Sequence, residues 1–170
     1  MQDHFKLSYF SKKKATGIFC NIEYHQFKKC SELSNFLASQ EKFVGATHNQ
    51  TIVSTIINEL LENAFKFSSN YIRSIRLSLI KLEDKLIIET INTADSLQAE
   101  SFKEYIKKFQ KNGAEKLFFD NIDFFSKNNP KKSKLGLAAL VKDYSCKLKM
   151  QLVPNTIVSN IVVKVELPAT

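Results

Sequence analysis

Cysteine is scarce in this sequence, and its arrangement excludes two kinds of site. Three cysteines occur among 170 residues, at Cys20, Cys30 and Cys146, and no C-x-x-C pair is present. An odd and widely spaced set indicates neither a disulfide framework nor a zinc site. The three histidines are equally scattered, without the H-x-x-x-H spacing of a helical metal site. We therefore predict reduced thiols and no histidine-based metal centre.

Long hydrophobic runs are missing as well. No stretch approaches the roughly 20 apolar residues that a membrane helix needs. Residues 1–14 lack the apolar core of a signal peptide. We therefore expect a cytoplasmic protein with no membrane partner.

The composition is that of a globular domain with a basic surface. Hydrophobic residues make up 44% of the chain, which includes 14 phenylalanines, and charged residues make up 25%. This is enough apolar material for one core, so we expect a single domain over residues 1–170. The net charge of +8 favours anionic partners. No basic motif is interleaved with aromatic residues, so nucleic acid is the least favoured of these partners.

Hydrophobic periodicity predicts an α+β order of elements. A strand at 15–24 and a helix at 30–44 belong to an N-terminal part, residues 1–46, and a long helix follows at about 50–67. The alternation at 71–92 is typical of a hairpin with one buried face. The remaining elements are two amphipathic helices within 95–129, a short helix leading into a strand at 135–148, and a closing strand at 157–168.

The long helix carries an unusual polar flank. Its apolar residues form one broad stripe, made of Val53, Ile56, Ile57, Leu60, Leu61, Ala64 and Phe65. Glu59, Asn63 and Lys66 fall together beside that stripe, whereas Glu62 points to solvent. An amide oxygen suits Mg²⁺, a nearby carboxylate can accept a proton, and a lysine can meet phosphate charge, as phosphoryl transfer requires. A core helix with ordinary polar flanks is an equally good interpretation of this segment alone.

Three motifs in order resemble those of the GHKL superfamily, which includes histidine kinases, gyrase-type and chaperone ATPases, and anti-sigma-factor serine kinases. "NELLENAFKFS" resembles the N box, with its E-x-x-x-N-A-x-K pattern at Glu59, Asn63, Ala64 and Lys66. "LIIETINTAD" is similar to the strand that leads into the adenine-binding D-x-G box. "KSKLGLAALVKDYSCKL" resembles the G-x-G-L-G-L-A-I-V box. The resemblance extends from about residue 51 to residue 168, about two thirds of the chain.

Two of these boxes depart from the family pattern. The aspartate expected to bind the adenine amino group is replaced by Asn92, an uncharged acceptor, or its role passes to Asp95. The first glycine of the phosphate loop is replaced by Lys134, so that Gly136 is the glycine that remains. Glycines at such loops let backbone N–H groups approach phosphates closely.

The resemblance implies a Bergerat-type two-layer sandwich, with a mixed, mainly antiparallel sheet, helices on one face and a helical lid at 96–134. It implies a Mg·ATP-dependent serine/threonine protein kinase of the anti-sigma-factor type, in bacterial partner-switching or two-component signalling. Glu59 would be the base and Asn63 the Mg²⁺ ligand. The nucleotide contacts would come from Lys66, Asn92, Asp95, Lys134, Gly136 and Leu137.

The partner expected from the resemblance is a small STAS-type antagonist or another signalling protein, and a homodimer stays open. The alternative is a non-catalytic binding module, a pseudokinase that regulates its partner by sequestration. The eroded adenine and phosphate boxes favour this alternative, whereas the joint presence of Glu59, Asn63, Lys66 and Gly136 favours the kinase.

Overall fold

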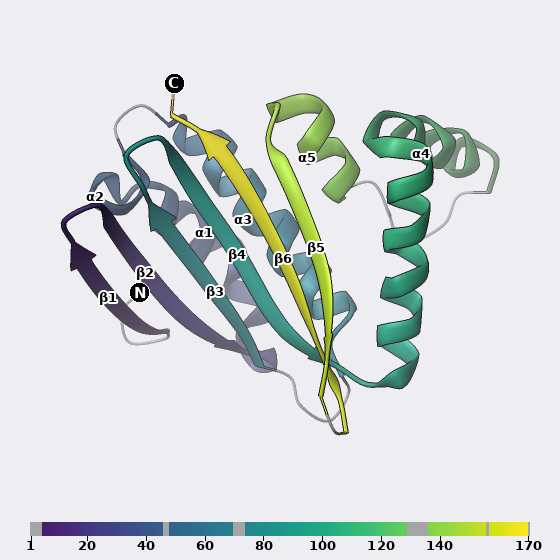
Figure 1. Ribbon diagram of the computed structural model, residues 1–170, viewed down its shortest axis with the longest axis horizontal. Helices are drawn as coiled ribbons and strands as arrows, with labels where there is room; N and C mark the ends of the chain where they lie inside the picture. Colours follow the sequence, from purple (N-terminus) through teal and green to yellow (C-terminus); the bar gives the residue numbers. More distant parts are fainter. Residues whose placement is uncertain (1–4, 46–47, 70–73, 129–135, 156, 170) are drawn as a thin grey trace.

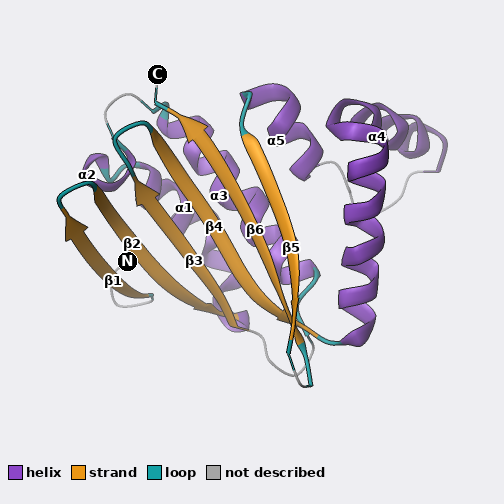
Figure 2. Ribbon diagram, viewed as in Figure 1, coloured by secondary structure: helices purple, strands orange, loops and turns teal. Residues whose placement is uncertain are grey.

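The computed structural model describes residues 5–45, 48–69, 74–128, 136–155 and 157–169, with only the backbone described at 24 and 120–128. It contains one six-stranded sheet in the order β1-β2-β3-β4-β6-β5, and every neighbouring pair of strands is antiparallel. Helices α1, α3 and α5 lie on one face of this sheet (Figures 1 and 2). The predicted α+β sandwich with helices on one face is confirmed.

β4 and β6 alternate between a buried and a partly exposed side, as expected for a sheet covered on one face. Their bounds are β1 Lys6–Lys12, β2 Ala15–Glu23, β3 Ser74–Lys81, β4 Lys85–Ala94, β5 Lys147–Pro154 and β6 Ser159–Pro168. In β4 every second residue from Leu86 to Ala94 is buried, and β6 repeats this pattern from Ile161 to Leu167. The predicted hairpin corresponds to β3 and β4, which pair directly.

The helices differ in length and in their place relative to the sheet. Their bounds are η1 Tyr24–Lys29, α1 Cys30–Ala38, α2 Glu41–Val44, α3 Gln50–Lys66, α4 Ser96–Asn128 and α5 Gly136–Tyr144. α3 lies behind β4 and β6, whereas α4 stands beside the edge formed by β5 and contacts α5 (Figure 1).

α3 is the central helix, and it follows the predicted pattern closely. Asn49 caps it, because its side-chain oxygen accepts hydrogen bonds from the backbone N–H groups of Thr51 and Ile52, at 2.9 and 3.3 Å. The predicted apolar stripe is buried from Val53 to Ala64. Phe65 differs, because it is only half-buried and packs its ring against Phe27, with 4.5 Å between ring centres.

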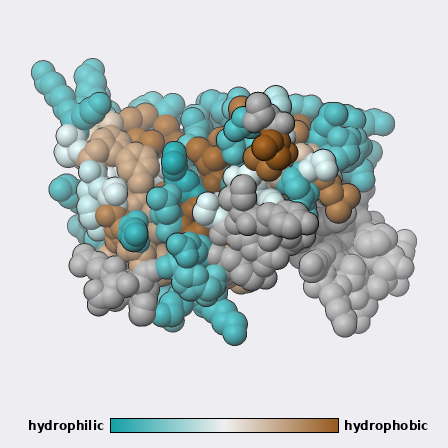
Figure 3. Space-filling model, turned by 90° about the horizontal axis from the view of Figure 1, so that it is seen from below, coloured by the Kyte–Doolittle hydropathy of each residue, from teal (hydrophilic) through white to brown (hydrophobic). Residues whose placement is uncertain are grey.

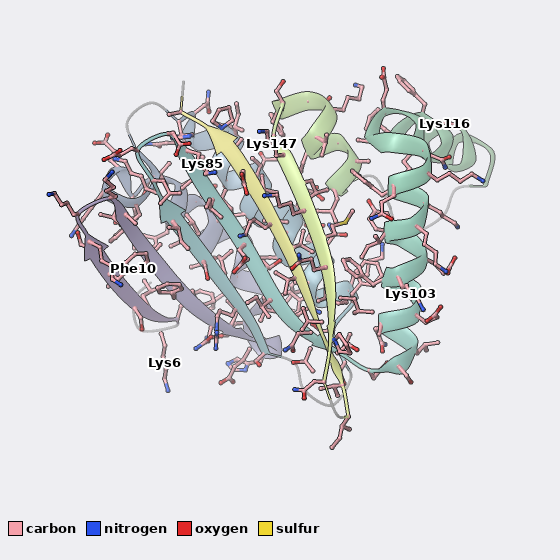
Figure 4. The ribbon with its side chains drawn as sticks, in the orientation of Figure 1. Lys6, Phe10, Lys85, Lys103, Lys116 and Lys147 are labelled. Atoms are coloured by element: carbon pink, nitrogen blue, oxygen red, sulfur yellow. The ribbon has the colours of Figure 1, made fainter. Side chains whose placement is uncertain are left out.

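The first strand, β1, was not predicted from the sequence. It pairs with β2 along its whole length through a tight turn at 13–14. The outer face of this hairpin is closed by Phe10, which stacks on Phe19 with 5.3 Å between ring centres (Figure 4). A Cβ atom at Gly17 would overlap the Phe10 ring, so glycine is needed where that ring crosses β2. Pairing across strands, rather than local periodicity, therefore defines this element.

α4 contains the two helical segments that were predicted, joined by a sharp kink. Gly113 has φ 73° and ψ 169°, a conformation that helices do not contain and that glycine adopts without strain. The predicted lid over 96–134 corresponds to α4 as far as Asn128. The rest of that range lies outside the described residues.

The sheet face opposite the helices mixes apolar and charged side chains. Glu166 lies between two lysines, with its carboxylate 2.8 Å from Lys149 Nζ and 3.3 Å from Lys85 Nζ. The labelled lysines in Figure 4 come from β1, β4, α4 and β5, so the positive charge is dispersed. Seen from below, hydrophobic residues reach the surface among hydrophilic ones, on the side where β1 to β3 lie (Figure 3).

The three cysteines are free, as predicted, and the structure buries all three. Burial raises the pKa of the Cys20 and Cys30 thiols to about 12, so both stay protonated at neutral pH. None of the helices in the described part of the chain is long and apolar enough to cross a membrane.

The packing of α3 on the sheet can be tested by comparing a Leu→Ala change at a buried site with the same change at an exposed site. Leu60 is 0% exposed on α3, and Leu97 is 76% exposed on α4. We expect Leu60→Ala to lower the free energy of unfolding by about 2–5 kcal/mol, because it removes buried methyl groups and leaves a cavity. Leu97→Ala should change it by less than about 0.5 kcal/mol. Urea unfolding monitored by circular dichroism measures both, and equal losses would contradict the assigned core.

Candidate functional site

Two of the predicted site residues meet a third from a distant part of the chain. Glu59 and Asn63 lie one turn apart on α3, and Gly136 is the first residue of α5. A Cβ atom built on Gly136 would overlap the Glu59 carboxylate and would lie 3.4 Å from Asn63 Nδ2. The start of α5 therefore packs directly on the polar flank of α3. Any larger side chain at this position would have to displace the end of the Glu59 side chain.

The Glu59 carboxylate lies in a half-buried place without a basic partner among the described residues. Burial raises the pKa of this carboxyl above its ordinary value of 4.5, and the nearby Glu62 carboxylate raises it further. Glu62 itself is exposed and accepts a hydrogen bond from Asn58 Nδ2 at 2.9 Å. A carboxylate with a raised pKa is a better proton acceptor at neutral pH than an ordinary one, which suits a general base.

Asn63 is oriented by its own helix. Its Nδ2 donates to the backbone carbonyl oxygen of Glu59 at 2.7 Å, so the amide is held in one orientation beside the start of α5. Its Oδ1 accepts no hydrogen bond from any residue that the structure describes. Mg²⁺ in phosphoryl-transfer sites takes one or two protein oxygens and completes its shell with phosphates and water. Asn63 Oδ1 fits the role of such a protein oxygen.

The described residues contain no group of three or more His, Cys, Asp or Glu side chains that could hold a metal ion. Lys66, the third member of the predicted flank, is exposed, and its Nζ lies 5.4 Å from the centre of the Phe67 ring. The structure thus brings Glu59, Asn63 and Gly136 together and leaves Lys66 near the end of α3.

Asn92 is buried on the inner face of β4, at the end of the strand that lies near the end of α3. Just beyond α3, Ser69 donates its backbone N–H to the carbonyl oxygen of Thr93 at 2.7 Å, which fixes these two ends side by side. Asn92 is 1% exposed, and neither its Oδ1 nor its Nδ2 has a hydrogen-bond partner among the described residues. A buried amide without partners is costly, and it indicates a place where a polar ligand or water is bound.

Asp95 and Leu137 have structural roles that the sequence did not predict. Asp95 caps α4, because its Oδ1 accepts hydrogen bonds from the backbone N–H groups of Leu97 and Gln98, at 3.1 and 3.2 Å. Leu137 buries its side chain in the core at the start of α5. Their predicted nucleotide contacts stay predictions. Lys134 lies outside the described residues.

Thr90 was missed by reasoning from the sequence. Thr90 lies two positions before Asn92 on the same face of β4, is 0% exposed, and has a hydroxyl without a partner among the described residues. The available signal was a threonine at an inward position of β4, where Leu86 and Ile88 precede it in the same row. Lys142 of α5 places its Nζ 4.6 Å from the centre of the Phe118 ring, which joins α5 to α4 by a cation–π contact.

The raised pKa of Glu59 predicts a pH-dependent effect of Glu59→Gln. An unfolded chain ionises this carboxyl near 4.5, whereas the folded chain ionises it at a higher pH. Stability is therefore lost as pH rises from the lower to the higher value, because the folded state then holds a charge in a desolvated place. We expect the stability of Glu59→Gln relative to wild type to rise between pH 4 and pH 8, as measured by urea unfolding.

The control for this experiment is Glu104→Gln. A hydrogen bond from Lys107, at 2.6 Å, lowers the pKa of Glu104, so the stability of Glu104→Gln relative to wild type should fall as pH rises toward 4.5 and stay level above that pH. A flat difference for Glu59→Gln across this range would mean that its carboxyl is not desolvated.

The unpaired groups on β4 predict stabilising substitutions. Thr90→Val keeps the shape and removes a hydroxyl without a partner, and Asn92→Leu does the same for the amide. We expect each to raise the free energy of unfolding by about 1 kcal/mol or more, because an unsatisfied buried polar group costs about 1–3 kcal/mol. Thr93→Val is the matched control, since Thr93 is a partly exposed residue of the same strand. Equal effects of the two Thr→Val changes in thermal and urea unfolding would refute the assignment.

Comparison with known proteins yields a structural likeness. No protein-family model and no curated protein sequence matches the chain. A chain in the crystal structure of the SiaB-SiaC complex from Pseudomonas aeruginosa has a similar fold, with a TM-score of 0.60 and 8% sequence identity. The alignment covers 98% of this chain and 92% of the other. The likeness therefore concerns the whole arrangement of strands and helices.

Proposed function

We propose that this chain is a GHKL-type signalling protein that binds ATP with Mg²⁺ and transfers the γ-phosphoryl group to a serine or threonine of a partner protein. The observation that carries the proposal is the meeting of Glu59, Asn63 and Gly136. These residues come from two motifs more than 70 positions apart, and they are the ones that the resemblance assigns to base, metal ligand and phosphate loop. If Glu59 and Asn63 were only ordinary polar residues on the flank of a core helix, nothing would explain why α5 places a glycine against them.

Each of these residues has a chemical role in the proposed reaction. Asn63 Oδ1 would hold the Mg²⁺ that neutralises charge on the phosphates. The backbone N–H groups at the start of α5, from Gly136 and Leu137, would donate hydrogen bonds to the phosphates, because the first N–H groups of a helix have no acceptor within it. Lys66 and Lys134 would add positive charge near the phosphates. Asn92 would contribute the polar group that meets the adenine base, since its amide is buried and unpaired.

In the proposed transfer step, Glu59 accepts a proton. A bond forms between the partner's hydroxyl oxygen and the γ-phosphorus, and the bond from that phosphorus to the bridging oxygen of ADP breaks. The hydroxyl proton passes to the Glu59 carboxylate, and ADP leaves. A hydroxyl is a poor nucleophile at neutral pH, so a positioned carboxylate with a raised pKa assists the transfer.

The proposed partner is a second signalling protein. The similar chain was crystallised in a complex of SiaB and SiaC, so a fold of this kind supports binding of a protein partner in at least one case. The resemblance to anti-sigma-type kinases adds a partner of the STAS type. At 8% identity the likeness extends to the fold alone, so the proposed activity rests on the residues of the site.

A non-catalytic module that acts by sequestration is the second candidate, and one feature favours it. The Glu59 carboxylate packs against the start of α5. That is where a phosphate would approach, and its charge repels an anion there. The kinase therefore requires Glu59 to turn away when nucleotide binds, whereas a sequestering module does not.

Glu59→Gln separates these two functions. The change keeps the shape of the side chain and removes the base. We expect phosphoryl transfer to the partner to fall by roughly 10²–10⁴-fold, the usual contribution of a general base. The affinity for ATP should not fall, because the change removes a negative charge beside the start of α5. Radiolabelled ATP measures transfer, and calorimetric titration with and without Mg²⁺ measures affinity.

Asn63→Ala is the companion variant, and it should remove the part of ATP binding that depends on Mg²⁺. Its folding is checked by circular dichroism, since Asn63 Nδ2 is bonded only within its own helix. Equal transfer by wild type and Glu59→Gln would remove Glu59 from the mechanism. A stable complex with the partner and no transfer by wild type would favour sequestration, and no binding of nucleotide at millimolar concentration would refute the nucleotide site.

A further inference from the structure

The sheet face opposite the helices carries apolar side chains that join across neighbouring strands. The strand registers place Phe10, Gly17, Ile80 and Ile87 side by side in one row, on β1 to β4. The ring of Phe19 extends this row, because it stacks on the ring of Phe10. The four side chains of Phe10, Phe19, Ile80 and Ile87 are called the open-face patch below.

The open-face patch is not covered by another part of the described chain. All four of its side chains remain partly exposed. Helices α1, α3 and α5 lie on the other face, and α4 stands beside the edge formed by β5 (Figures 1 and 2). An apolar patch that is rimmed by polar residues is typical of a surface that binds a partner.

The charged residues of the same face are mostly basic. The strand registers place six cations on it, Lys6, Arg76, Lys85, Lys147, Lys149 and Lys164, and two carboxylates, Glu89 and Glu166. Both carboxylates are already paired with lysines of this face, Glu89 with Lys164 and Glu166 with Lys85 and Lys149. These pairs leave a surplus of positive charge on the open face.

The surplus is carried by three exposed side chains at the borders of the open-face patch. Lys147 lies beyond Glu166 in the row of Ile87, whereas Lys6 and Arg76 share another row, on the strands that carry Phe10 and Ile80. None of these three cations forms a salt bridge with a described residue. The patch therefore combines a central apolar row with positive charge that is not compensated within the described chain.

We propose that the open face binds an acidic partner protein, through a segment whose apolar stripe is flanked by Asp and Glu. The apolar stripe would cover the open-face patch, and the flanking carboxylates would meet Lys6, Arg76 and Lys147. Burial of apolar area supplies affinity, and the opposite charges select the partner and speed its association.

Two other occupants fit the same surface less well. A second copy of this chain would bring two positively charged faces together, and like charges repel across an interface. A nucleic acid would be attracted by the lysines, but its phosphates gain nothing from two isoleucines and are repelled by Glu89 and Glu166. Charge complementarity therefore favours an acidic protein.

The open face is separate from the site on α3. Glu59 and Asn63 lie on a helix of the opposite layer, so the sheet stands between them and a partner bound here (Figure 1). The proposal therefore does not depend on the proposed nucleotide chemistry. A partner held on this face would leave the α3 site accessible.

Binding of a synthetic helical peptide tests the proposal, without any nucleotide present. The peptide has about 20 residues, so it is roughly 30 Å long as a helix, with a leucine stripe and glutamate flanks. The control peptide has the same stripe and lysine flanks. We expect the full chain to bind the acidic peptide at least about tenfold more tightly in fluorescence anisotropy, because only its flanks attract the cations of the open face. High salt should reduce this difference.

Substitutions locate the binding surface. We expect Lys147→Glu and Ile87→Thr each to weaken binding of the acidic peptide by roughly threefold to tenfold, since one reverses a charge and the other removes apolar area. Lys116→Glu is the matched control for charge, because Lys116 is exposed on α4, away from the open face (Figure 4). It should change the affinity by less than about twofold. Circular dichroism checks that each variant is folded.

Four outcomes would overturn the proposal. Equal binding of the two peptides, or no binding of either, would exclude an acidic partner of this kind. Equal weakening by Lys147→Glu and Lys116→Glu would mean that net charge alone attracts the peptide. A single-stranded oligonucleotide that displaces the acidic peptide, and whose binding Ile87→Thr weakens, would assign the face to nucleic acid. A dimer in light scattering that Ile87→Thr dissociates would assign it to a second copy.

Discussion

The structure depends on the packing of α3 against the sheet. Val53, Ile56, Ile57, Leu60 and Leu61 are all fully buried, and they meet the inner rows of β3, β4 and β6. Removal of this much apolar surface from water is the main favourable term of folding, and it sets the rotation of the helix about its axis. Once the stripe faces the sheet, the positions beside it are fixed at the boundary between core and solvent. Glu59 and Asn63 occupy that boundary.

The chemistry of the site follows from this position. A carboxylate on the outer face of α3 would be fully hydrated, and one in the stripe would be excluded by its desolvation cost. At the flank, Glu59 is half-buried, and α5 covers it through the close approach of Gly136. Burial then raises its pKa above the ordinary value. The same helix orients Asn63 through a hydrogen bond to the backbone of Glu59, so one element positions both groups.

The inner face of β4 differs from the flank of α3. On β4 the polar groups lie among apolar neighbours and are paired with nothing that the structure describes. Such groups reduce stability, and proteins retain costs of this kind where binding or catalysis needs them. The flank of α3 and the inner face of β4 meet at the end fixed by the Ser69–Thr93 hydrogen bond.

Local periodicity in the sequence was enough to predict α3, the β3–β4 hairpin, the two segments of α4 and the α+β class. Each depends on hydrophobic spacing or on a glycine within a few residues, and such local patterns can be recognised without knowledge of the fold. The motif order also indicated Glu59, Asn63 and Gly136 as members of one site. Only the tertiary structure decided that these three touch, that Thr90 and Asn92 lack partners, that Asp95 caps α4 and that β1 pairs with β2. These features depend on contacts between residues far apart in the chain, and spacing along the sequence carries no information about what a buried side chain meets across a sheet or between helices.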